Sequence, residues 1–240
     1  ITRYIDNDRD NTSHWYDRLH LDKCKPHIFS YEKTDNSHKF EGCLASNCLM
    51  PAVYFTLTYE LNGNALEVGI KYKTSDHVKN LPRLGIEFSV DKSYNSFSYV
   101  GFGPTESYVD KHVACEYGYY ESTAEENYDM NYIRPQESGS HYACRYLELK
   151  DLFAVTAEAP FSCSVNPYTT TQLCKTRHNF ELEENDFINV CIDLGMRGIG
   201  SHSCGPALQE KYEILRTEGY QEGQWVLVDL NDIIVHIFHK

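Results

Sequence analysis

Hydrophobic and polar residues alternate along most of this chain in short runs that are separated by turn residues. Alternation with a period of two places every second side chain on one face, which is typical of a half-buried β-strand. Residues 52–74 predict a hairpin of two strands around Asn62-Gly63-Asn64, because Asn-Gly favours the positive φ of a tight turn. Further strands are predicted over residues 84–91, 97–103, 142–149, 153–165 and 186–195.

Helical patterns are few and short. Residues 12–22 predict a helix with a Ser or Thr cap, and residues 169–178 predict one or two turns with a threonine cap. The chain has no alternation of strands with helices and no repeat of about 20 to 50 residues. We therefore expect an all-β fold, a large antiparallel sandwich with few short helices. The 19 tyrosines and 11 phenylalanines suit strand packing, although a tyrosine-rich surface also suits carbohydrate.

The formal net charge of −13 argues against nucleic acid or an anionic membrane as the main partner, because both require a positive surface. No run approaches the roughly 20 apolar residues that span a bilayer. The chain begins with Ile1 and shows no signal peptide, so we expect a cytoplasmic protein that is a fragment or a processed chain.

The nine cysteines are irregularly spaced and include no CxxC pair of the kind that binds zinc. This favours reduced, mostly buried thiols in a cytosolic protein. Cys174 and His178 lie four residues apart, as on one helix face, but no second ligand pair accompanies them. We expect no metal and no cofactor in this chain.

The chain also lacks a recognisable catalytic set. Hydrolysis of a glycosidic bond requires two facing carboxylates, and no spacing singles out a pair among the 35 acidic residues. There is no GxSxG elbow, no HExxH and no phosphate-binding glycine loop with a lysine. No residue of the chain is predicted to be catalytic.

Four loops stand out by composition. The first holds Asp6, Asn7 and Asp8 around Arg9, and such a cluster can bind a cation, hydrogen-bond sugar hydroxyls or form a turn held by its own side chains. The second and third span residues 103–112 and 132–149. We expect bracing there, a partly buried network of the charged side chains Glu106, Asp110, Arg134, Glu137 and Arg145.

The fourth loop, GIGSHSCGP at residues 198–206, places three glycines and a proline around a histidine and a cysteine. Its composition predicts either an unusual backbone path or the presentation of polar side chains to a ligand.

Six blocks, in order, carry a family resemblance: TRYIDNDRDN, LPRLGIEFSV, YVGFGPTESYVDKH, YIRPQESGSHYACRYLEL, YTTTQLCKTRHNFEL and GMRGIGSHSCGPALQEKYEI. Together they resemble the C-terminal domain, or small chain, of the large bacterial β-galactosidases over about residues 1–215. The resemblance implies an antiparallel β-supersandwich related to galactose-mutarotase-like domains. It also implies that the catalytic glutamates lie in a separate TIM-barrel domain or large subunit, so that this chain alone is inactive on lactose-class β-galactosides. The complete family enzymes often use magnesium and sodium, with ligands mostly in other domains.

The same resemblance implies that two loops contribute to the rim of the partner's active site. The substrate-rim candidates are Asp6, Asn7, Asp8, Arg9, Ser201, His202, Ser203 and Cys204. The chain departs from the family at Asp10, which stands where many members have a glycine and puts hinge-like behaviour of the first loop in doubt. In the second loop some members have a tryptophan platform and others a Ser-x-Ser-Cys-Gly-Pro version. This chain resembles the second type, with Cys204 where the tryptophan would be. A nucleophilic role for Cys204 is not expected, because no paired base is evident.

The tail, residues 218–240, instead resembles the C-terminal hairpin of the ribosomal silencing factor (Iojap-like) family. Its pattern predicts strands over residues 225–229 and 233–238. We therefore divide the chain into a sandwich over residues 1–215 and a hairpin over residues 216–240, packed on the same domain. Two alternatives stay open, a ribosome-interacting protein acting through the tail and a stand-alone carbohydrate-binding or mutarotase-like module. The module would use His141, His178 and Glu137 on one concave sheet.

Overall fold

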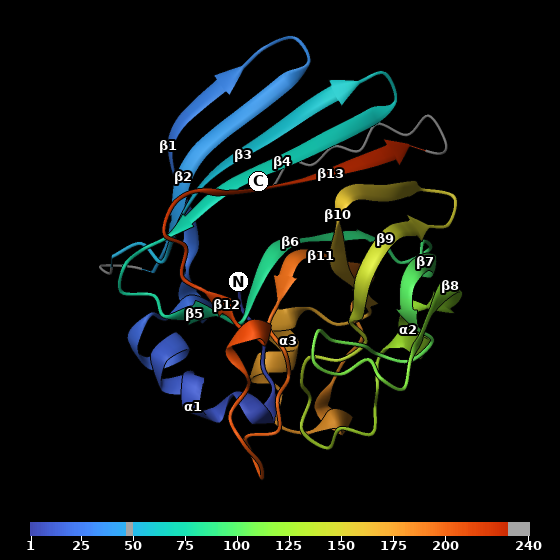
Figure 1. Ribbon diagram of the computed structural model, residues 1–240. Helices are drawn as coiled ribbons and strands as arrows, with labels where there is room; N and C mark the ends of the chain where they lie inside the picture. The colour runs from blue at the N-terminus through green and yellow to red at the C-terminus, as the bar shows by residue number, and fades with distance from the viewer. Residues whose placement is uncertain (47–49, 230–240) are drawn as a thin grey trace.

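The computed structural model describes residues 1–46 and 50–229. Within these residues the strands form an 11-stranded sheet, and its strand pairs are antiparallel (Figure 1). The main path runs through β1 (Lys25–Lys33), β2 (Ser37–Ala45), β3 (Val53–Asn62), β4 (Ala65–Thr74), β13 (Gln221–Asp229), β10 (Phe153–Asn166), β9 (His141–Leu149), β7 (Ser96–Gly103) and β8 (Glu116–Thr123). Two more strands, β11 (Phe187–Met196) and β6 (Arg83–Asp91), branch from β10. The predicted all-β, antiparallel class is confirmed.

The strands predicted from the alternating pattern are present in the structure. The predicted hairpin forms β3 and β4, joined by the two residues Gly63-Asn64, and the other five predicted regions form β6, β7, β9, β10 and β11. Strands β1, β2 and β8 were not predicted. A separate two-stranded ladder pairs β5 (Asn80–Leu81) with β12 (Ile214–Leu215).

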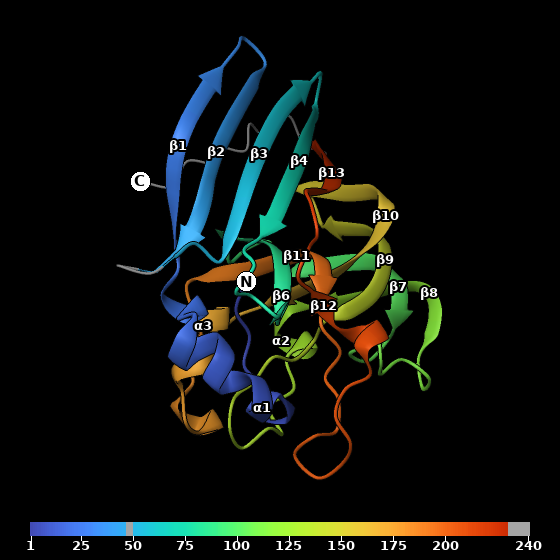
Figure 2. The same cartoon turned by 60° about the vertical axis from the view of Figure 1, so that its left-hand side comes forward.

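The sheet bends at β10, which belongs to two ladders. On one side of this 14-residue strand β9 pairs with both halves, while on the other side β13 pairs with the first half and β11 with the second. The β1–β4 strands project away from the rest as a wing, and the short helices and long loops gather at the opposite end (Figures 1 and 2).

The helical segments lie mainly at that loop end. Among the described residues they are three short α-helices, α1 (Arg9–Thr12), α2 (Ala124–Asn127) and α3 (Thr170–Lys175), a π-helical segment (Ser13–Arg18) and 3-10 turns at Asp6–Asp8, Leu21–Lys23, Asn179–Glu181 and Glu210–Tyr212. The predicted threonine cap of α3 is confirmed, because Thr169 and Gln172 form a capping box. The helix predicted to begin at a Ser or Thr cap near residue 12 instead begins at Arg9, with no side-chain cap hydrogen bond.

Two apolar cores hold these elements. The larger lies between the strands and includes the fully buried Val155, Leu147, Ile192 and Trp225. The smaller packs the N-terminal helical segment on the β5 region around Trp15, whose indole N–H donates to the backbone and side-chain oxygens of Asn80. Among the described residues, no helix is long and apolar enough to cross a membrane.

The first strand of the predicted tail hairpin is part of the sheet. β13 pairs with β4 along one edge and with β10 along the other, and it brings Trp225 into the larger core. The second predicted strand, residues 233–238, and its turn lie outside the described residues. The division at residue 215 stays a prediction.

Replacing Trp225 therefore tests whether the tail is integral to the sandwich. Trp225→Ala is expected to lower the free energy of unfolding by about 3–5 kcal/mol, because it leaves a large cavity in the core. Urea denaturation measures this. The neighbouring exposed residue provides a matched control, since Gln224→Ala is expected to change stability by less than about 0.5 kcal/mol. Equal stabilities of the two variants would contradict the packing described here.

Candidate functional site

Two loops that are far apart in sequence meet at the loop end of the molecule, and Asn7 joins them. Its amide Nδ2 donates to the carbonyl oxygen of Gly200 at 2.7 Å. Its Oδ1 accepts from both the backbone N–H and the hydroxyl of Ser203, at 3.2 and 2.6 Å. Residues 6–11, the predicted first loop, are helical in the structure. Together with the loop over residues 198–206 they form one continuous surface, which we call the rim.

A buried ionic cluster lies beneath the rim. Both oxygens of the Asp8 carboxylate accept from Arg3, at 2.9 and 3.0 Å, and Oδ1 also accepts from Arg197 Nη1 at 2.6 Å. The Arg3 guanidinium further donates to the carbonyl oxygens of Arg197 and Gly198. Residues 3–8 are thereby fixed to the start of the second loop.

Arg197 extends this cluster to the last part of the chain. It donates to both oxygens of Glu213 at 2.6 Å, the two-pronged geometry that suits a guanidinium and a carboxylate. Burial alone would lower the pKa of Arg197, but hydrogen bonding to Glu213 and the charge of Asp8 more than offset this, so that its pKa is raised. Both carboxylates are therefore occupied by arginine.

The pairing of Asp8 with two arginines corrects the prediction that this side chain lies at the substrate rim. Only 3% of the residue is exposed, and it lies between two guanidinium groups. A carboxylate so buried must be paired, because removing charge from water is costly. Asp8 braces the rim from below and does not face a ligand.

Asp110 holds the second loop from the other side. Its carboxylate accepts from the backbone N–H groups of Ile199 at 2.9 Å and Gly200 at 2.7 Å. A Cβ on Gly198 would lie 2.7 Å from the Asp110 carboxyl carbon, and Gly200 has a φ of 62°. Glycine at these positions permits the close approach and the left-handed backbone. The loop follows the unusual path that its composition predicted.

The other predicted rim residues remain near solvent. Asp6 and Arg9 of the first loop, and Ser201, Ser203 and Cys204 of the second, lie at the surface, and His202 is half-buried. His202 also lines a small hollow of 80 Å³ between the loops, with Asn7 and Leu208. Hydroxyl, amide, imidazole and carboxylate groups of this kind can exchange hydrogen bonds with a polyhydroxylated ligand.

The five side chains predicted to share one network are instead separate, which corrects that prediction. Each has contacts of its own. Glu106 accepts from Lys111, Tyr132 and the Gly139 N–H; Asp110 holds the loop; Arg134 lies over the Tyr4 ring; Glu137 pairs with Arg83; and Arg145 donates to the Glu158 carbonyl oxygen.

Arg83 forms a second buried ionic centre that sequence reasoning missed. It donates to both oxygens of Asp193, at 3.0 and 2.6 Å, and to Glu137 and Thr170. Burial would lower the pKa of Arg83, but Asp193 more than offsets this and the pKa is raised. Burial raises the pKa of Glu137. The centre joins β6 to β11, and it lies too deep to meet a ligand.

The residues proposed for a stand-alone sugar module do not come together either. His141 is 1% exposed, its ring stacks on Tyr99 with centroids 3.8 Å apart, and its Nε2 contacts Asn127 Oδ1 at 2.9 Å. His178 is half-exposed beside Glu181. Burial lowers the pKa of His141 to about 3, so this ring is a neutral core residue at neutral pH. Glu137 is bound to Arg83.

Across residues 1–46 and 50–229, no group of three or more His, Cys, Asp or Glu side chains is arranged to hold a metal ion. The cysteines in this part of the chain are free; Cys204 is exposed, and Cys43, Cys144, Cys163 and Cys191 are buried.

Comparison with known proteins gives the family of this chain. The family model described as beta galactosidase small chain matches residues 2–223 of the chain. The chain therefore belongs to the β-galactosidase small-chain family.

Curated relatives agree with this assignment. The chain is 43% identical over 157 residues to the β-galactosidase of Actinobacillus pleuropneumoniae, a match that covers 65% of this chain and 15% of the relative. It is 33% identical over 186 residues to the β-galactosidase of Staphylococcus xylosus, covering 76% of this chain and 19% of the relative. The chain thus spans less than a fifth of the length of either relative.

Solved structures show only a distant likeness. A galactose mutarotase related enzyme from Lactobacillus acidophilus has a TM-score of 0.39 at 8% identity, covering 88% of this chain and 73% of that one. The galactosidase domain of an alpha-galactosidase-sucrose kinase has a TM-score of 0.38 at 9% identity, covering 86% of this chain and 28% of that one. Similarity at this level does not determine a function, and the assignment rests on the family match.

The two carboxylate hydrogen bonds of Asp110 generate a prediction about the rim. Asp110→Ala removes the acceptor for two backbone N–H groups, so the amides of Ile199 and Gly200 are expected to exchange with deuterium about tenfold faster or more. Hydrogen exchange with mass spectrometry measures this. Asp6→Ala, whose carboxylate accepts from Tyr4, is the control and should leave exchange at residues 199–200 unchanged. Unaltered exchange in the Asp110 variant would refute the anchoring role.

The neutral core position of His141 generates a prediction about pH. In the unfolded chain this imidazole binds a proton near its ordinary pKa of about 6.5, whereas the folded pKa is about 3. The unfolded state therefore binds more protons between these values, and stability falls as the pH falls. Between pH 5.5 and 4.5, the wild type should lose about 1.4 kcal/mol per pH unit more than His141→Gln.

Urea denaturation across this pH range measures the difference. Leu147→Ala is the control, since it removes a buried side chain without a titrating group and should keep the wild-type slope. Parallel slopes for the wild type and His141→Gln would show that the imidazole is not buried in its neutral form.

Proposed function

We propose that this chain is the C-terminal domain or small subunit of a β-galactosidase, and that its rim completes the active site of a partner TIM-barrel domain. The observation that carries the proposal is the joining of the two loops through Asn7, which presents them as one surface. The family match and the β-galactosidase relatives support it.

In this proposal the partner supplies the catalytic carboxylates. Asp8 and Glu213, the acidic groups directly beneath the rim, are both held by Arg197 and cannot serve as an acid and nucleophile pair. The rim residues of the two loops, Ser201 to Cys204 with Asp6 and Arg9, would hydrogen-bond the terminal galactosyl group and exclude water. The contribution of this chain is therefore positioning, and the chain alone is inactive.

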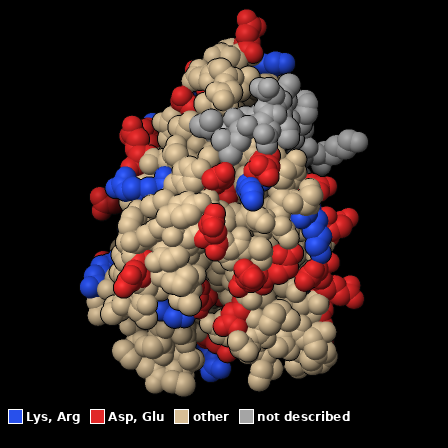
Figure 3. Space-filling view, turned by 90° about the vertical axis from the view of Figure 1, so that its right-hand side faces the viewer, with Lys and Arg blue, Asp and Glu red and all other residues tan. Residues whose placement is uncertain are grey.

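The surface and the tail fit this proposal better than the alternatives. Acidic side chains are spread widely over the face shown in Figure 3, as the net charge of −13 requires. Such a face disfavours nucleic acid. The described part of the tail, β13, is paired along both edges, so it offers no free strand edge to a ribosomal partner.

Complementation tests the proposal. The chain is mixed with a β-galactosidase of Actinobacillus pleuropneumoniae truncated before the matched residues, and hydrolysis of a chromogenic β-galactoside is followed. We expect no turnover by either part alone and restored turnover by the mixture. Joint replacement of Ser201, Ser203 and Cys204 by alanine should lower kcat/KM of the mixture about tenfold or more, because the rim positions the substrate.

The control is Asn62→Ala, at the tip of the β3–β4 hairpin, which lies at the far end of the molecule (Figure 1). It should match the wild type in restored activity. Turnover by the isolated chain would contradict the division of labour. Full activity of the triple variant in a restored mixture would exclude these three side chains from the rim's function.

A further inference from the structure

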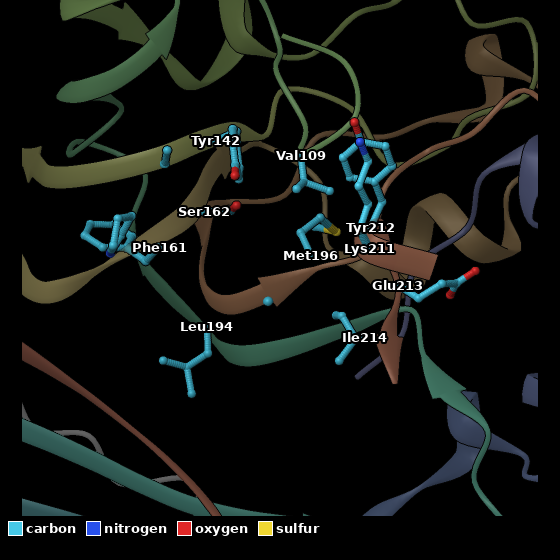
Figure 4. Close-up of a pocket in the computed structure, with 13 residues that line it drawn as sticks. Val109, Tyr142, Phe161, Ser162, Leu194, Met196, Lys211, Tyr212, Glu213 and Ile214 are labelled. Carbon is cyan, nitrogen blue, oxygen red and sulfur yellow. The ribbon is translucent and has the colours of Figure 1, made fainter. Parts of the chain in front are cut away.

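A second pocket lies behind the rim, between the bend of the sheet and the segment that leads into β12. It has a volume of about 360 Å³, and its lining includes Tyr142, Phe161, Ser162, Met196, Lys211 and Tyr212. Figure 4 shows these side chains around a common space, with Val109 on one side and Ile214 on the other. The volume lies within the range of small-molecule sites.

The pocket exists because the β9–β10 ladder breaks here. Strand β10 pairs with β9 up to Thr156 and resumes only at Phe161, and the interrupted stretch includes Pro160, which has no N–H to donate. On the facing strand, Ala143 has a φ of 55°, a left-handed conformation that is uncommon for a residue with a Cβ. The bulge leaves room between the strands that side chains do not fill.

A buried hydroxyl faces this room. Ser162 is only 7% exposed, and its side chain lines the pocket. Figure 4 shows the hydroxyl oxygen turned toward the space beside Tyr142. A bound group with a donor or an acceptor can exchange a hydrogen bond with this hydroxyl.

A free positive charge lies at the open side of the same pocket. The exposed Lys211 places its ammonium group 4.6 Å from the centre of the Tyr212 ring and forms no ion pair with any described carboxylate. Glu213, the acidic residue of the lining, is already bound by both prongs of Arg197. The unmatched charge of the pocket is therefore positive, in a chain with a net charge of −13.

We propose that this pocket binds a small aromatic carboxylate with a hydroxyl at its far end. The hydroxyl would exchange a hydrogen bond with Ser162 in the interior, and the carboxylate would meet Lys211 near solvent. The ring would lie between, against Tyr142, Phe161 and Met196, where aromatic and thioether surfaces favour it. The charged end stays hydrated, and the apolar part is removed from water.

The probe is 3-(4-hydroxyphenyl)propionate, followed by NMR of methionine methyl groups labelled with ¹³C. The chain has three methionines, and only Met196 lines the pocket, whereas Met50 and Met130 are exposed elsewhere. We expect the Met196 signal, assigned with Met196→Leu, to shift saturably while the other two stay in place. A ligand of about twelve heavy atoms should bind with a Kd of roughly 0.1–10 mM.

Two matched ligands and two variants separate the contacts. Removing the hydroxyl (3-phenylpropionate) or the charge (4-(3-hydroxypropyl)phenol) should each weaken binding about three- to tenfold. Ser162→Ala should abolish the preference for the hydroxylated probe, and Lys211→Gln the preference for the carboxylate. Lys33→Gln, at the end of β1, is the charge-matched control and should bind like the wild type.

Several results would overturn the proposal. These are a Met196 signal that does not move at about 10 mM probe, equal shifts at all three methyl groups, or unchanged ligand preferences in both variants. The experiment uses this chain alone and reports on binding, so its outcome is independent of whether the rim completes a β-galactosidase active site.

Discussion

Asp8 is a buried carboxylate shared by two arginines, and the loop end of the molecule depends on this arrangement. Arg3, Asp8 and Arg197 each have less than 5% of their surface exposed. Charges in such a place are tolerated only when paired, and removing one partner leaves an uncompensated buried charge. The N-terminal segment, the end of β11 and the Glu213 segment can therefore take one relative position only, which determines where the two rim loops leave the protein.

Strand β11 connects this cluster to the rest of the fold. Asp193, within the strand, binds Arg83 on β6, and Arg197, directly after the strand, binds Asp8 and Glu213. One strand thus carries a residue for each buried ionic centre. β11 therefore connects the sheet to the rim. The register of β11 with β6 and β10 determines where the rim loops lie.

Much of the fold follows from the alternating pattern, and the exceptions have physical reasons. Strand β1 was missed because its side chains are mostly exposed and it contains Pro26, so no apolar face marks it. Strand β8 carries Gly118 and has several exposed tyrosines and glutamates. In contrast, β3, β4 and β11 were found because one or both faces meet the core.

The sequence indicated which two segments form the site, but not which residues these segments contact. The two loops stood out by their residues, yet Arg197, which binds Asp8, is 189 positions from it, and Gly200, which binds Asn7, is 193 positions from it. No local spacing predicts such contacts. The five charged residues were expected to form one network, but Glu137 instead binds Arg83, which is 54 positions away and which no local pattern links to it.

The break in the β9–β10 ladder has a consequence for how this domain can change over evolution. The space that it leaves is lined by residues close to the anchors of the rim. Val109 precedes Asp110 in the chain, and Met196 precedes Arg197. Glu213 both lines the space and binds Arg197. A mutation that enlarges or fills this space acts on the anchors without touching any exposed rim residue. The shape of the rim can thus drift through substitutions in the interior, while its exposed residues keep their sequence.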